Sequence, residues 1–215
     1  QRVMHRVSRA QVEHDAPAVA AAIPILFCAV DGIDGDGVVT LRRKALQIAD
    51  ANLAAHGGII TLHLAQRDLE AAGEQVAQLA KARPTHPVTQ FFQAQLAFDT
   101  GNHKAAKEMV ANLLKGAPDH PMVNQLAGAI EVASGSPELA RNYLSKTLVA
   151  APSSLVARQL LGATLLHTGE PQKALAVLGP LLSQAAPDPG TLALAGEAQM
   201  HLGDLEAASA LFAKQ

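Results

Sequence analysis

"LVARQLLGATLLHTGEPQKALAVLGPLL" (residues 155–182) holds two apolar helical patterns separated by a glycine, and this stretch decides how the rest of the chain is read. Leu161 and Leu165 recur at the spacing of one helical face. Gly169 gives the backbone the freedom that a tight turn needs. Pro171 suits the first turn of a second helix, because its missing N–H would have no partner there. The stretch predicts a helix–turn–helix hairpin.

The residues that mark the turn and the ends of this hairpin recur every 34 residues. When the repeats are aligned, four columns of equivalent positions share this period. They are the turn glycines (Gly101, Gly135, Gly169, Gly203), the alanines five residues after each glycine (Ala106, Ala140, Ala174, Ala208), the small residues seven positions before each glycine (Ala94, Gly128, Gly162, Gly196) and the prolines that end each unit (Pro84, Pro118, Pro152, with Pro187 displaced by one). Several independent columns with one period indicate an array of repeats. Gly162 and Ala174 are expected where the two helices cross, because a bulky side chain would hold the helices apart.

The repeat positions divide the chain into a repeat array and a segment before it. The repeat array is expected over residues 53–215, in units 53–86, 87–120, 121–154, 155–188 and an incomplete 189–215. Arg67 replaces the turn glycine in the first unit. Residues 37–52 are interpreted as a degenerate half repeat, and residues 1–36 as a non-repeat N-terminal segment. The last unit stops without a polar capping helix, so we expect either an excerpt of a longer protein or self-association through uncapped ends.

Composition limits the function classes. The chain has 215 residues, 49% hydrophobic and 17% charged, with a formal net charge of −2, which is typical of a globular or repeat protein. A near-neutral charge without a Lys/Arg stripe argues against nucleic-acid binding. The lone Cys28 excludes an internal disulfide and a multi-cysteine metal site.

The N-terminal segment imitates a signal peptide without matching one. Its apolar run at residues 16–30 is too short to span a bilayer comfortably as a helix. Glu13, His14 and Asp15 interrupt the passage from basic to apolar residues. We interpret the segment as a buried helical or irregular stretch, with a spent or distorted signal as the alternative. No direct membrane span is expected in this chain.

Motifs for metals, cofactors and catalysis are weak or absent. "DGIDGDGV" (31–38) resembles a calcium loop, but Gly32 occupies the first ligand position and Arg43 replaces the final glutamate, so we interpret it as a flexible turn. His167 and His201 lie one repeat apart, about 10 Å at ordinary helix spacing, which is too far for zinc bonds of about 2 Å. The sequence lacks the glycine-rich and nucleophile motifs of common enzymes. We therefore predict no metal, no cofactor and no enzyme.

The columns over residues 53–215 resemble tetratricopeptide (TPR) repeats, which have this period and punctuation. The resemblance implies an all-α fold, a right-handed superhelical solenoid of helical hairpins. Residues 118–182 and 191–212 further resemble the large TPR lipoproteins of the bacterial PEP-CTERM system. That narrower resemblance implies a periplasmic or outer-membrane-associated assembly for exopolysaccharide export or protein sorting, although a cytoplasmic location stays open.

In TPR proteins the first helix of each hairpin lines a concave groove, which implies where a protein or peptide partner would bind. "FFQAQLAF" (91–98) places Phe91, Gln95 and Phe98 on one helical face. Comparable places in later units complete the predicted groove: Gln125, Gln159, Leu166, His167, Met200 and His201. The alternative is that Phe91 and Phe98 belong to the core. TPR clamps for acidic C-termini use Lys and Asn at such places, so that ligand class is not expected here.

The sequence therefore predicts a protein–protein interaction scaffold that holds an extended or helical apolar segment. Two alternatives stay open: a structural spacer within a longer solenoid, and a helical enzyme whose active groups lie in residues 1–36. No catalytic residue can be named for the second.

Overall fold

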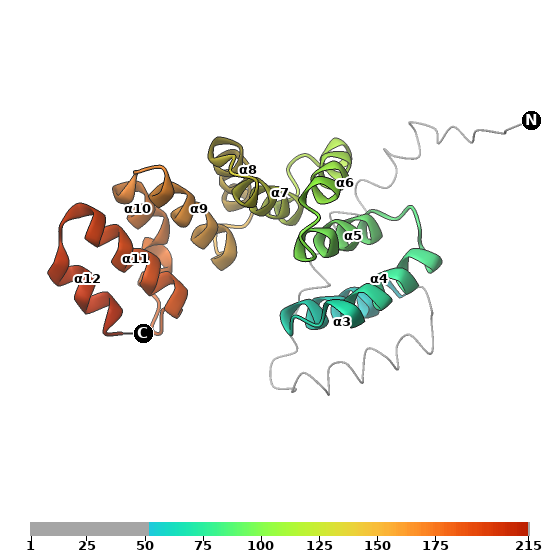
Figure 1. Ribbon diagram of the computed structural model, residues 1–215, viewed down its shortest axis with the longest axis horizontal. Helices are drawn as coiled ribbons and strands as arrows, with labels where there is room; N and C mark the ends of the chain where they lie inside the picture. Colours follow the sequence, from blue (N-terminus) through green and yellow to red (C-terminus); the bar gives the residue numbers. More distant parts are fainter. Residues whose placement is uncertain (1–51, 215) are drawn as a thin grey trace, which may run out of the picture. The chain divides into compact units, whose positions relative to one another are not determined.

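The computed structural model describes residues 52–214, so the predicted segment 1–36, the half repeat up to residue 51, the calcium-like loop and Cys28 lie outside it. Within this range the chain forms α helices and no strands (Figure 1). The helices are α3 (Leu53–Ala65), α4 (Leu69–Ala82), α5 (Pro87–Asp99), α6 (His103–Gly116), α7 (Pro121–Ala133), α8 (Pro137–Ala150), α9 (Leu155–His167), α10 (Pro171–Leu182), α11 (Pro189–Leu202) and α12 (Leu205–Phe212). None of these helices is long and apolar enough to cross a membrane.

Residues that cap helices also recur every 34 residues. The N-cap position is held by Asn52, His86, His120, Ser154 and Asp188 in the first helices and by Asp68, Asn102, Ser136, Glu170 and Asp204 in the second. The side chains of His120, Ser136 and Glu170 make no capping hydrogen bond, and the others accept one from a backbone N–H of the first turn. At Asp68, for example, the carboxylate accepts a hydrogen bond from the Ala71 N–H at 3.0 Å. Such a bond satisfies one of the backbone donors that a helix start leaves free. Local chemistry therefore sets where the helices begin.

The turn within each hairpin needs a left-handed residue. Gly101, Gly135, Gly169 and Gly203 have φ between 69° and 81°. Arg67 occupies the same place in the first hairpin and adopts φ 61°. Glycine adopts this backbone conformation easily, whereas it is strained for residues with a Cβ. Glycine therefore recurs every 34 residues because each of these turns needs a left-handed residue.

The chain divides into two compact units, one ending at Pro118 and one beginning at Asp119. In the described part of the first unit, α3 pairs with α4 and α5 with α6, and α5 also packs on α3 and α4. In the second unit α7 to α12 pack consecutively, and the first helices α7, α9 and α11 also contact one another in sequence. In each unit the core forms where neighbouring hairpins pack against one another, as expected for stacked repeats.

The second unit shows why a small column lies seven residues before each turn glycine. A Cβ added to Gly128 would lie 2.6 Å from Leu144 Cγ, and one added to Gly162 would lie 3.1 Å from Leu178 Cγ. In the last hairpin the Phe212 ring would be 2.5 Å from a Cβ on Gly196. The expectation that Gly162 lies at a helix crossing is confirmed.

Candidate functional site

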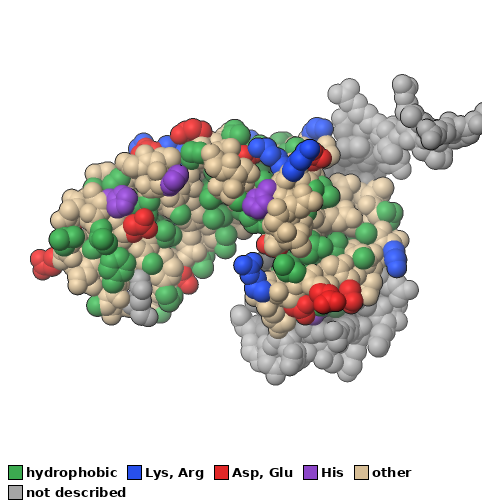
Figure 2. All heavy atoms as spheres, viewed as in Figure 1, with side chains coloured by type: hydrophobic (Ala, Val, Ile, Leu, Met, Phe, Trp, Pro, Cys, Tyr) green, Lys and Arg blue, Asp and Glu red, His purple; other side chains and the backbone are tan. Residues whose placement is uncertain are grey.

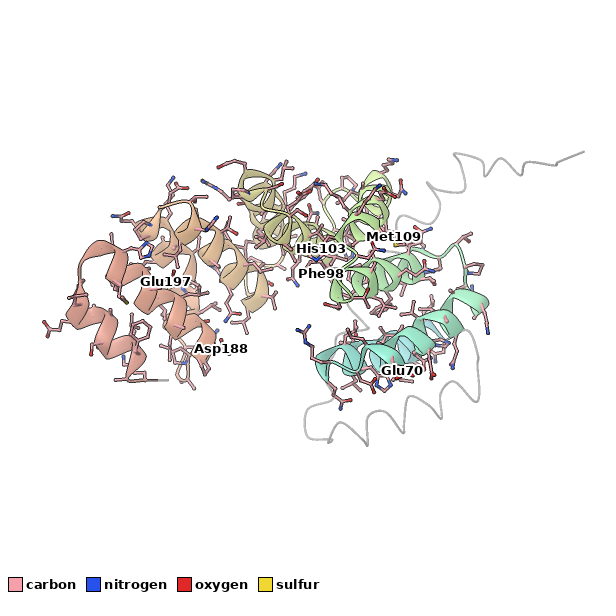
Figure 3. All side chains as sticks on the ribbon, viewed as in Figure 1. Glu70, Phe98, His103, Met109, Asp188 and Glu197 are labelled. Atoms are coloured by element: carbon pink, nitrogen blue, oxygen red, sulfur yellow. The ribbon has the colours of Figure 1, made fainter. Side chains whose placement is uncertain are left out.

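The α5 part of the predicted groove contains one buried residue, Phe91, and two half-buried ones, Gln95 and Phe98. Phe91 is 4% exposed, and its ring packs edge-on against Phe92 with centroids 5.5 Å apart. Phe98 is half-buried and makes a similar contact with His103 at 5.4 Å (Figure 3). Gln95 donates to Asp99 Oδ2 at 3.0 Å within the same helix. Of the two interpretations of Phe91, groove or core, the structure favours the core for this residue, because the side chain packs inside its own unit.

The two later glutamines connect neighbouring hairpins. Ser154 Oγ, at the start of α9, donates to Gln125 Oε1 of α7 at 2.8 Å. One repeat later, Gln159 Nε2 donates to the Asp188 carboxylate at the start of α11, at 2.6 Å. Both glutamines are half-buried, and these bonds stabilise the stacking of the hairpins.

The remaining predicted residues lie at the ends of α9 and α11. Leu166 is buried in a core cluster with Leu161 and Leu165 and has no free surface to offer a partner. His167 and His201 are exposed, and Met200 is 51% exposed. His201 Nε2 lies 4.0 Å from Glu197 Oε1 on the same helix. Within residues 52–214 no cluster of three or more His, Cys, Asp or Glu residues could hold a metal ion.

A continuous stripe runs along each first helix of the second unit. We define the docking face as these stripes with Val132 and Met200: Met122, Gln125, Ala129 and Ala133 of α7; Val156, Gln159, Ala163 and His167 of α9; Gly190, Ala193, Glu197 and His201 of α11. Within each stripe the spacing is i, i+3, i+7 and i+11, which is one helical face. Every member is half-buried or exposed.

The docking face contains both larger apolar side chains and small ones. Val132, Val156 and Met200 are 36%, 48% and 51% exposed. Ala129 on α7 and Ala163 on α9, one repeat apart, are half-buried. Figure 2 shows many hydrophobic and few charged side chains on the visible face of the second unit. The arrangement could accept the backbone and apolar side chains of another segment.

Sequence reasoning missed most members of the docking face, among them Val132, Val156, Ala163 and Glu197. The signal that could have found Val132 is the 34-residue column, because Val132 lies between Phe98 and Leu166 in that column. Glu197 follows Ala163 by the same interval and is labelled on α11 in Figure 3, away from the helix start at Asp188.

Ionic contacts join α8 to the start of α10. Glu170 accepts hydrogen bonds from Arg141 of α8 and from Lys173. The hydrogen bond from Lys173 is the main cause that holds the pKa of Glu170 below its ordinary value; burial opposes it, and the Arg141 charge also lowers the pKa. At His120, directly before α7, burial has the opposite effect and lowers the pKa, because desolvation disfavours the charged imidazolium.

Comparisons with known proteins identify the fold. No protein-family model matches the chain, and no curated protein matches it in sequence. PilF of Pseudomonas aeruginosa superposes with a TM-score of 0.64 at 13% identity, covering 94% of this chain and 90% of that chain. TTC0263, a thermophilic TPR protein of Thermus thermophilus, has a TM-score of 0.63 at 20% identity and covers 80% and 89%.

A third similar structure is YrrB, described as a TPR protein with an unusual peptide-binding site, with a TM-score of 0.56 at 18% identity, covering 82% of this chain and 91% of that chain. Identities this low show the fold alone. The helical hairpins, the 34-residue columns and these structures agree, and they confirm the predicted fold class. Over the residues that the structure describes, the chain is an all-α tetratricopeptide-repeat solenoid.

Proposed function

We propose that the chain is a protein–protein interaction scaffold that binds an apolar segment of a partner protein across the docking face. The observation that carries the proposal is the stripe of half-buried and exposed side chains, most of them small or apolar, that repeats on α7, α9 and α11. A contiguous exposed apolar surface is a mark of interaction sites. The peptide-binding site of YrrB, a protein of similar fold, supports the same class of function.

The chemistry of the docking face favours an uncharged, apolar ligand. Ala129 and Ala163 let a partner backbone approach closely, while Val156 and Met200 provide larger apolar contacts. Methionine adapts its shape to different apolar partners. Glu197 is the carboxylate on this face, so a polar or cationic group is favoured beside it. Acidic segments are disfavoured, because the docking face as defined contains no lysine or arginine.

A peptide selection tests this proposal. Random twelve-residue peptides displayed on phage are selected against the chain, and the tightest peptide is measured by fluorescence anisotropy. We expect apolar peptides, and we expect Val156→Asp with Met200→Asp to weaken their binding by about ten-fold or more. Val149→Asp is the matched control, because Val149 is 84% exposed on α8, outside the docking face.

Two results would count against the docking face. Selected peptides that bind the double variant and the wild-type chain equally would move the site elsewhere. A failure to select any peptide would favour a structural spacer. Circular dichroism and a melting curve check that the double variant is folded, which both substituted side chains allow because they are about half exposed.

We further propose that the partner belongs to a bacterial envelope assembly for exopolysaccharide export or PEP-CTERM protein sorting. What supports this is the resemblance of residues 118–182 and 191–212 to lipoproteins of that system. Fractionation of the native cells is the test: we expect the chain in the periplasmic or outer-membrane fraction, cross-linked to an export or sorting protein. Recovery from the cytoplasm alone would contradict the proposal.

A further inference from the structure

The amide of Gln159, on the α9 part of the docking face, is held in one orientation. Its Nε2 donates to the Asp188 carboxylate at 2.6 Å and to Thr191 Oγ1 at 3.1 Å. A carboxylate only accepts hydrogen bonds, so the nitrogen must be the atom that faces Asp188. Gln159 Oε1 makes no hydrogen bond within the part of the chain that the structure describes, and it is open to solvent. A partner therefore meets the acceptor end of this amide.

Glu197 adds a second free acceptor on α11 (Figure 3). Its side chain is 53% exposed, and its Oε1 lies 4.0 Å from His201 Nε2, which is longer than a hydrogen bond. Among residues 52–214, no lysine or arginine pairs with Glu197. The imidazoles of His167 and His201 can donate as well as accept. The polar groups of α9 and α11 on this face thus favour a partner that supplies donors.

The basic residues nearest in sequence before α11 are engaged elsewhere. Arg141 and Lys173 both contact the carboxylate of Glu170 at the start of α10. The sequence contains no lysine or arginine between Lys173 and Lys214, and α11 lies entirely within that interval. The charge of Glu197 is therefore not balanced from its own helix, and a cation of a partner would complement it.

An apolar contact lies next to this carboxylate. Met200 is 51% exposed and follows Glu197 by three residues on α11. Residues three apart on a helix are neighbours, with their Cβ atoms about 5–6 Å from each other. Lysine and arginine have an apolar stem and a charged end, so one such side chain can pack on Met200 and reach Glu197 together.

We infer that the partner segment of the docking face is apolar and carries a lysine or arginine, whose cation pairs with Glu197 while its stem packs on Met200. The inference rests on the proposed function and adds the charge of the partner to it. Apolar residues beside the basic one contact Val156, and an N–H of the segment donates to Gln159 Oε1. Charge complementarity of this kind selects the partner more than it raises affinity, so the expected change in affinity is modest.

Parallel peptide selections test the charge of the partner. Random twelve-residue peptides on phage are selected against the wild-type chain and against Glu197→Lys. We expect apolar peptides with lysine or arginine from the first selection and apolar peptides with aspartate or glutamate from the second. Glu138→Lys is the matched control, because Glu138 is 81% exposed on α8, outside the docking face, and it should select the same peptides as the wild-type chain. Wild-type peptides without basic residues, or the same peptides from all three chains, would overturn the inference.

Fluorescence anisotropy then measures the pair in the tightest wild-type peptide. Replacing the lysine of the peptide by norleucine, or its arginine by citrulline, should weaken binding about three- to five-fold, and so should Glu197→Gln in the chain. The two changes together should weaken binding no more than one alone, because both remove the same pair. Both effects should shrink when salt is raised from about 0.05 M to about 0.5 M. Effects that simply add, or that salt does not reduce, would contradict the pairing.

The outcomes separate this inference from the proposed function. Peptides that the Val156→Asp and Met200→Asp double variant no longer binds, but that depend neither on a basic residue nor on Glu197, would keep the docking face and overturn only the charge of the partner. A selection that yields no peptide would overturn both. Circular dichroism checks the fold of Glu197→Gln, which the 53% exposure of the side chain allows.

Discussion

At the scale of single residues, helical glycines differ in the room that surrounds them. Gly128 has Leu144 directly above it, so an added Cβ would lie 2.6 Å from that side chain. Gly73, inside α4, would place its Cβ 3.7 Å from Leu96 Cδ2, an ordinary contact. The first glycine is required by packing, and the second is merely tolerated.

Alanine substitution at these two glycines should therefore act in opposite directions. Gly128→Ala should lower the free energy of unfolding by about 1–2 kcal/mol, because overpacking outweighs the gain in helix propensity. Gly73→Ala should raise it by up to about 1 kcal/mol, because the propensity gain stands alone. Urea titrations of both variants measure the difference. Equal effects would show that the crossing at Gly128 is not tightly packed.

Arg67 adopts a left-handed backbone conformation that is strained for a residue with a Cβ, whereas the glycines at the same turn adopt it without strain. Its φ of 61° is left-handed, as at Gly169 with φ 76°. Arg67→Gly should stabilise the first hairpin by roughly 0.5–1 kcal/mol, the left-handed strain less the greater entropy of an unfolded glycine. Gly169→Ala should destabilise by about 1 kcal/mol. Thermal melts of both variants check the pair, and a destabilised Arg67→Gly would mean that the arginine side chain makes compensating contacts.

At the scale of elements, single hydrogen bonds tie one hairpin to the next. Gln159 of α9 donates to Asp188 and to Thr191 at the start of α11, at 2.6 and 3.1 Å. Gln159→Ala should cost about 1–2 kcal/mol, since it removes a hydrogen bond to a charged group. Gln95→Ala is the control, because its bond stays within α5, and it should change stability by less than about 0.5 kcal/mol. Equal losses in urea titrations would contradict an inter-repeat role.

The contact between α8 and α10 should depend on pH. Hydrogen bonding to Lys173 keeps the pKa of Glu170 lower in the folded chain than its ordinary value of 4.5. The folded state therefore binds fewer protons than the unfolded state, and the stabilisation is fully present above pH 4.5. It is lost as the pH falls through the lower, folded pKa.

Glu170→Gln tests this dependence. The variant should melt at a lower temperature than the wild-type chain at neutral pH, and the difference should disappear as the solution is acidified below pH 4.5. Glu138→Gln is the control, because Glu138 is 81% exposed and lies 3.8 Å from Arg141. A difference between Glu170→Gln and the wild-type chain that persists unchanged at low pH would show that the carboxylate charge is not the cause.

At the scale of the whole molecule, the second compact unit is expected to fold on its own. Residues 119–215 contain two apolar clusters built from α8 to α11, such as Leu161 with Ala174 and Leu178 with Ala195. Solenoid units depend on their nearest neighbours. Expressed alone, this fragment should show helical circular dichroism and a cooperative melt. A fragment that is unfolded in buffer would mean that the second unit needs the first.

The sequence by itself determined the features that depend on nearby residues. Turn glycines such as Gly203, prolines in the first turn of a helix such as Pro171 and the helical spacing of apolar residues predict where helices begin, end and present an apolar face. The 34-residue repetition of these signals predicts the helical hairpins and the fold class, and the structure and the similar solved proteins confirm both. Such signals are local, because each acts within one or two turns of helix.

Only the tertiary structure decided which residues face outward. Phe91 and Met200 were both expected on the groove, but Phe91 packs against Phe92 in the core and Met200 is exposed. Gln125 bonds to Ser154, a residue 29 positions away. Exposure and bonding depend on what a neighbouring hairpin places opposite each position. Since the repeats share their spacing but differ in side-chain size and polarity, periodicity identifies the face and packing selects the residues that are free to bind.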